Sequence, residues 1–161
     1  MIGEAADGRR PRCDWVEDAV LLLGGGDEFE RLREEGRRLL AEGPPPLSDS
    51  DVPWSCYEIW NLLKDVEDCL ADPARAAQLA RAPYDAMLWF ALRLHRAWQP
   101  RAKAVLQAIE TIDGELYELA SRFLLANAAE GYASLVAMQR HLADTFNLDF
   151  RVPYVSPTQK R

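Results

Sequence analysis

The chain has 161 residues, of which 48% are hydrophobic, and a formal net charge of -7 from 19 basic and 26 acidic side chains. This length and composition fit one domain with a real hydrophobic core and argue against a mainly disordered chain. Because no excess positive field exists to release counterions, we expect no direct binding to nucleic acid. No apolar run approaches the roughly 18 residues of a membrane span. The start of the sequence also lacks the charged region followed by an apolar region that is typical of a signal peptide. We therefore expect a soluble, cytoplasmic protein that does not bind a membrane.

Cysteine and histidine usage predicts neither a disulfide framework nor a metal site. The three cysteines, Cys13, Cys56 and Cys69, include no Cys-x-x-Cys pair. If Cys56 and Cys69 share one helix, they lie about 20 Å apart, too far to bridge, so buried thiols are expected. Only His95 and His141 could join them, and neither has a second ligand at metal spacing. We expect no cofactor and no metal.

The chain divides into three parts by composition and periodicity. Residues 1–14 lack periodicity and predict a flexible N-terminal segment, whereas residues 15–146 form a helical domain. Residues 147–161 form a polar tail with two prolines. A strand is conceivable only within residues 21–23. The expected class is all-α, as a five- to six-helix bundle or irregular helical array.

The first two helices are predicted from caps and apolar spacing. Asp27 can cap a helix that ends at Gly43, before the Pro44–Pro46 connection. A second helix begins near Pro53, with Ser50 or Asp51 as its cap. Its apolar positions follow helical spacing and are Cys56, Ile59, Trp60, Leu63, Val66 and Leu70.

Prolines and aspartates mark the remaining helices. Asp72 and Pro73 begin a third helix, and Pro83 removes a backbone donor, so we expect a break or kink there. The pattern resumes over residues 84–98. Further helices are predicted over residues 101–112, over a segment capped by Asp113 that runs to Leu125, and over residues 128–146.

Several strings resemble one domain of a known enzyme family. They are Tyr57–Asp68, Arg93–Lys103 with Val105 and Leu106, and the upstream segments 24–32 and 43–48. Together they resemble the C-terminal helical domain that follows the catalytic domain of bacterial polymerase-beta-like nucleotidyltransferases, over about residues 15–125. The resemblance implies a domain that binds substrate or docks on a catalytic domain. The Gly-Ser turn and strand-borne aspartates of that catalytic domain are absent here, so we expect no catalytic residue in this chain.

Two short motifs suggest enzymes that their context does not favour. The string Gly25-Gly26-Asp27-Glu28-Phe29 matches the diguanylate cyclase signature, which requires a turn between two strands. Here a predicted helix follows, so an aspartate-capped helix is the preferred interpretation and a cyclase a remote alternative. The string Asp49-Ser50-Asp51 has the spacing of a magnesium-binding aspartate pair, but prolines flank it and capping explains both carboxylates better.

The candidate binding residues lie on two charged faces. Glu58, Asn61, Asp65 and Asp68 share one stripe of the second helix. The opposing set around the end of the third helix is Arg93, His95, Arg96, Arg101 and Lys103. The resemblance implies that the acidic stripe receives a cationic or hydroxyl-bearing acceptor, while the simpler interpretation is two solvated faces. The aromatic set Tyr57, Trp60, Trp89 and Trp98 is typical of a core and less so of a ligand cage.

The leading hypothesis is therefore a non-catalytic helical domain that binds a substrate or a partner chain. Its expected partners are a second copy in a homodimer, a nucleotidyltransferase catalytic domain, or a small-molecule acceptor. The alternative is a stand-alone protein–protein interaction bundle of a dimerising or antitoxin-like kind. An enzyme in its own right ranks third.

Overall fold

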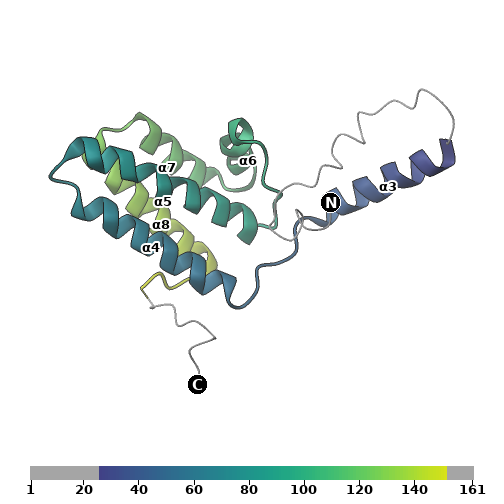
Figure 1. The fold of residues 1–161 in the computed structure, drawn as a ribbon, viewed down its shortest axis with the longest axis horizontal. Coiled ribbons are helices and arrows are strands. Elements are labelled where there is room, and N and C mark those ends of the chain that lie inside the picture. The colour runs from purple at the N-terminus through teal and green to yellow at the C-terminus, as the bar shows by residue number, and fades with distance from the viewer. Residues whose placement is uncertain (1–25, 152–161) are drawn as a thin grey trace, which may run out of the picture.

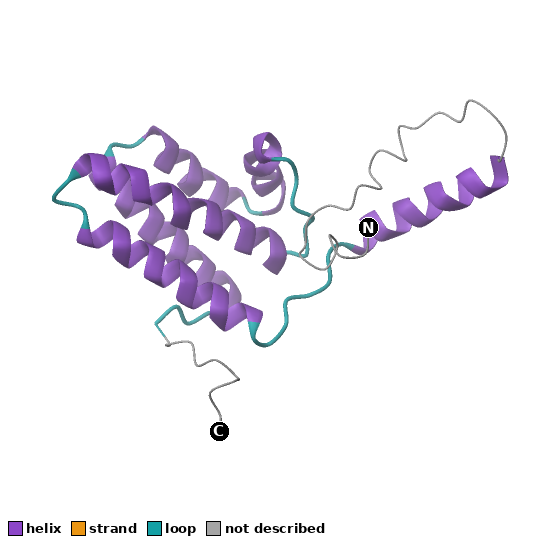
Figure 2. Cartoon of the chain, in the orientation of Figure 1, coloured by secondary structure: helices purple, strands orange, loops and turns teal. Residues whose placement is uncertain are grey.

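A computed structural model of the chain describes residues 26–151. Within that range there are helices and no strand (Figure 2). They are α3 (Gly26–Glu42), α4 (Asp51–Asp68), α5 (Pro73–Leu94), the short 3-10 helix η1 (Ala102–Ala104), α6 (Val105–Ile112), α7 (Gly114–Leu125) and α8 (Ala128–Phe146). The all-α prediction is confirmed. The predicted flexible segment, the conceivable strand at 21–23 and most of the polar tail lie outside the described residues.

Four helices form the body of the molecule. In Figure 1, α5 runs through its centre, with α4 along one side, α7 along the other and α8 behind, while α6 closes one end. The α4–α5, α5–α8 and α7–α8 pairs carry the main helix contacts. The core holds Ile59, Met87, Ile109, Leu116 and Leu135, all essentially inaccessible to solvent. Helix α3 projects away from this body (Figure 1). None of the helices described here is long and apolar enough to cross a membrane.

The helix starts follow from side-chain caps. Asp72 accepts the backbone N–H of Arg75 at 3.2 Å, with proline in the first turn of α5. Helix α4 begins at Asp51, slightly before the predicted Pro53, and its N-cap residue Ser50 forms no side-chain capping bond. The Ser48 N–H donates to Asp51 Oδ2 at 3.0 Å, and the Asp51 N–H donates to Ser48 Oγ at 3.2 Å. Of the two predicted caps, Asp51 thus bonds to the turn before α4, whereas Ser50 forms no capping bond.

Of the break or kink predicted at Pro83, the break does not occur, since α5 continues through Pro83 to Leu94. A proline inside a helix costs about 3 kcal/mol relative to alanine. The Pro83 ring is fully buried, as are neighbouring Tyr84 and Met87, so packing offsets the lost backbone hydrogen bond. Helix α5 ends four residues before the predicted Trp98, and Arg96 then adopts a left-handed conformation with φ 54°.

The segment after α5 holds the end of α3 in place. The Trp98 indole N–H donates to the Leu40 carbonyl at 3.0 Å. The Arg96 guanidinium donates to the carbonyls of Glu42 and Pro44 at 3.1 and 3.4 Å. These bonds satisfy carbonyl groups at the C-terminal end of α3 and place a positive charge there. The direction in which α3 leaves the bundle is therefore fixed by side chains more than fifty residues away in sequence.

Packing continues beyond α8 into the predicted polar tail. Phe150 is buried, and its ring meets Phe90 edge-on with the centroids 6.4 Å apart. The backbone N–H of Leu148 donates to the Ala143 carbonyl at 3.0 Å, and Asn147 is left-handed at the helix end. The boundary expected at residue 147 thus falls within packed structure.

Candidate functional site

A pocket of about 360 Å³ lies between the facing sides of α4 and α5. Its walls are mostly apolar, and its polar side chains come from both helices. It is lined by Leu47 from the connection before α4, by Ser55, Glu58 and Ile59 from α4, and by Ala86, Trp89, Phe90 and Arg93 from α5. These positions recur every three or four residues, as a single helix face requires.

Two opposite charges line this pocket without pairing with each other. The exposed Glu58 carboxylate forms no hydrogen bond or ion pair within the part of the chain that the structure describes. Arg93 donates through Nη2 to the Pro45 carbonyl at 3.2 Å, while its Nε is buried and bonds to no described group. Both side chains therefore keep hydrogen-bonding capacity for a bound molecule.

The guanidinium of Arg93 also influences the cap of α4. Hydrogen bonds with Ser48 lower the pKa of Asp51, and the positive charge of Arg93 adds to this effect. The carboxylate that begins α4 is therefore held ionised. The charged side chains that line the pocket itself are one carboxylate, Glu58, and one guanidinium, Arg93. An anionic ligand group has one favourable partner here, Arg93.

The structure separates most of the other predicted binding residues. Asn61, Asp65 and Asp68 are exposed further along α4 and do not line the pocket. Arg96 binds the end of α3, and His95 turns toward Asp113. Arg101 and Lys103 are exposed around η1. The expected pair of opposing stripes is therefore reduced to one pair of candidates, Glu58 and Arg93, at a common pocket.

The aromatic residues are divided between core and surface. Trp60 and Trp89 are half-buried and pack against the core cluster. Tyr57 lies beside Trp60 with ring centroids 6.1 Å apart. Trp89 also lines the α4–α5 pocket. The interpretation of the aromatic set as mainly core thus omitted that Trp89 lines this pocket.

A partly buried cluster of two histidines and one aspartate was not predicted. His141 Nε2 lies 2.9 and 3.0 Å from the two carboxylate oxygens of Asp113, and His95 Nε2 lies 3.7 Å from Oδ2. The Asp113 side chain is 6% exposed. Burial would raise the pKa of Asp113, but the Leu116 N–H and the two histidines lower it below its usual value. Sequence spacing identified Asp113 as a cap and gave no sign of its partners from other helices.

This cluster joins three helices. Asp113 belongs to the start of α7, His141 to α8, and His95 to the end of α5. The His95 ring meets Phe146 edge-on, with centroids 5.0 Å apart. Within residues 26–151 no group of three or more His, Cys, Asp or Glu is arranged to hold a metal ion. Burial raises the pKa of the Cys56 thiol to about 11, which disfavours a thiolate nucleophile there.

Comparison with known proteins adds no relative, because no protein-family model, curated protein or solved structure matches this chain. The resemblance to the nucleotidyltransferase helical domain stays a prediction from the quoted strings.

Proposed function

We propose that this chain is a non-catalytic helical binding domain and that the α4–α5 pocket is its ligand site. The observation that carries the proposal is the position of Glu58 and Arg93 on one apolar pocket of about 360 Å³. Small-molecule sites typically enclose about 300–1,000 Å³, with apolar walls and a few convergent polar groups. This pocket has both properties.

The charges of the pocket indicate the kind of ligand. Trp89, Phe90 and Ile59 offer contact area to an apolar or aromatic body. Glu58 can accept hydrogen bonds from an ammonium or hydroxyl group, and Arg93 can donate to a carboxylate. The ligand class is a small molecule with an apolar body that carries a cationic or hydroxyl group, an anionic group, or both. Docking on a nucleotidyltransferase domain and homodimer formation stay further predictions.

Three probes with the same phenyl ring separate these contributions. Phenethylamine carries only the cation, phenylacetate only the anion, and L-phenylalanine both. Binding is measured by NMR titration of each probe. Glu58→Gln should weaken phenethylamine about tenfold and spare phenylacetate, while Arg93→Gln should do the reverse, since charge-assisted hydrogen bonds contribute roughly 1.5–3 kcal/mol.

Asp65→Asn is the matched control, because it removes the same charge from an exposed carboxylate on the same helix, away from the pocket. It should leave all three affinities unchanged. Thermal melts of each variant guard against loss of the Arg93 bond to Pro45. Absence of saturable binding by all three probes would overturn the proposal. If Asp65→Asn and Glu58→Gln weakened the affinity for phenethylamine equally, the binding of this cation would be nonspecific charge attraction.

A further inference from the structure

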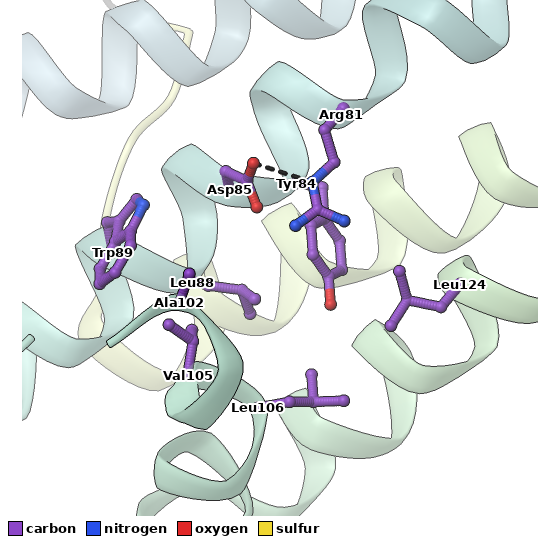
Figure 3. A pocket seen from close by; sticks show the side chains of 9 residues that line it. All are labelled: Arg81, Tyr84, Asp85, Leu88, Trp89, Ala102, Val105, Leu106 and Leu124. Atoms are coloured by element: carbon purple, nitrogen blue, oxygen red, sulfur yellow. Dashed lines mark hydrogen bonds and ion pairs between the residues drawn. The ribbon is translucent and has the colours of Figure 1, made fainter. Parts of the chain in front are cut away.

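A second pocket, of about 210 Å³, lies between α5 and the segment formed by η1, α6 and α7. Figure 3 shows its side chains: Leu88 from α5, Val105 and Leu106 from α6, and Leu124 from α7 surround an apolar space. Arg81 and Asp85 stand at its edge. Trp89 lines this pocket as well as the α4–α5 pocket.

Tyr84 brings a hydroxyl to this apolar space. The residue is only 2% exposed, its ring stacks on Phe123 with centroids 4.6 Å apart, and the Arg81 guanidinium lies 4.9 Å from the ring centroid. These two contacts hold the ring in place. Its hydroxyl bonds to no residue between 26 and 151 and points into the pocket toward Leu106 (Figure 3). The hydroxyl is therefore available to hydrogen-bond with a molecule in the pocket.

The charges at the edge are already paired, which restricts the ligand. Arg81 Nε donates to Asp85 Oδ2 at 2.8 Å, so the guanidinium is neutralised by its neighbour one turn away. Burial raises the pKa of Tyr84, so the phenol stays protonated and can both donate and accept a hydrogen bond. Nothing in this pocket requires a charged ligand.

The size of the pocket sets the size of the ligand. A dry cavity of roughly 150 Å³ lined by Leu, Ile and Phe binds benzene, and drug-sized molecules occupy about 300 Å³ or more. A volume of about 210 Å³ lies between these limits. We infer that this pocket binds a neutral one-ring molecule, such as a phenol, cyclic alcohol or cyclic ketone, whose oxygen hydrogen-bonds to Tyr84. This site is separate from the α4–α5 pocket and does not depend on the function proposed for it.

Two probes of nearly equal shape test whether the Tyr84 hydroxyl forms a hydrogen bond with the ligand. Fluorine NMR titrations compare para-fluorophenol with fluorobenzene, which lacks the oxygen. The wild-type chain should bind para-fluorophenol about fivefold more tightly, as one net hydrogen bond provides. Tyr84→Phe should abolish this preference and leave the affinity for fluorobenzene within about twofold.

Two further variants show whether the probes bind in this pocket: one fills the pocket, and the other is a control close by in sequence. Leu106→Trp places a larger side chain in the pocket and should abolish binding of both probes. Leu125→Trp enlarges a residue that is 89% exposed and does not line the pocket, so it should leave both affinities unchanged. Should Tyr84→Phe fail to fold, the Leu106→Trp result still decides whether the probes occupy this space.

Three results would overturn the inference. They are absence of probe binding by the wild type, persistence of the para-fluorophenol preference in Tyr84→Phe, and unchanged probe binding in Leu106→Trp. The two sites are distinguishable, because Glu58→Gln should not alter binding of either fluorinated probe. Conversely, Leu106→Trp should leave L-phenylalanine binding at the α4–α5 pocket unchanged.

Discussion

Gly43 and Arg96 meet backbone to backbone, so closely that a Cβ atom on residue 43 would lie 2.5 Å from the Arg96 carbonyl oxygen. Both residues are left-handed, with φ 73° at Gly43 and φ 54° at Arg96. Glycine adopts this conformation without cost, and here it also allows the close approach. Through this contact the end of α3 meets the segment that follows α5.

We predict that Gly43→Ala lowers the free energy of unfolding by at least about 2 kcal/mol, because the left-handed backbone alone costs an alanine about 1–2 kcal/mol and the backbone carbonyl must also move. Urea denaturation monitored by circular dichroism measures the change. Gly114→Ala is the control, since a Cβ there meets nothing within 4 Å. Equal stability of the two variants would contradict the predicted contact.

The second prediction concerns the pH dependence of Asp113. Its pKa is lowered in the folded chain, so its stabilising contribution is present above the usual carboxyl pKa and is lost as the pH falls through the folded value. Asp113→Asn keeps an oxygen that can cap α7 but removes the charge beside His141 and His95. At neutral pH this variant should unfold about 2 kcal/mol more readily than the wild type.

The difference between the Asp113→Asn variant and the wild type should shrink as the pH falls below about 4, near the usual carboxyl pKa. Asp72→Asn serves as the comparison, because Asp72 caps α5 and no histidine contacts it in the described structure. Its cost should be a few tenths of a kcal/mol. A pH-independent cost for Asp113→Asn would contradict the lowered pKa of Asp113.

The third prediction tests whether Trp60 is structural. Trp60→Ala should lower the free energy of unfolding by about 3 kcal/mol, the low end for large core aromatics, since this ring is packed on the core but half-buried. Trp54→Ala in the same helix removes a side chain that is 46% exposed and should cost about 1 kcal/mol or less. Thermal melts of both variants provide the measurement. A Trp60→Ala melt unchanged within error would assign Trp60 to a binding surface.

Local chemistry explains why several elements could be predicted from the sequence. Asp72 and Asp113 cap helices as expected, and Gly43 ends α3 as expected. The bounds of α8 agree with the predicted 128–146. Each of these features depends on hydrogen bonds or backbone preferences within about four residues, so the local sequence is enough to predict it.

The candidate sites depend on contacts between helices. The spacing of α4 correctly placed Glu58 on a polar stripe, but it could not show that only this member of the stripe faces Arg93 across a pocket. Likewise, nothing near His95 in sequence indicates Asp113 or His141. Such pairings are set by the crossing angles of the helices and by their relative shift along the helix axes.

The sequence by itself determined which segments become helices, where most of them begin and end, and that the chain has a helical core. Tertiary structure decided that α5 continues through Pro83 and that both histidines contact Asp113. It also decided that the Tyr84 hydroxyl points into an apolar pocket. The physical reason is the distance along the sequence over which each interaction acts. Capping and helical periodicity act over one turn, whereas burial and the partners of a polar group depend on surfaces brought together by packing.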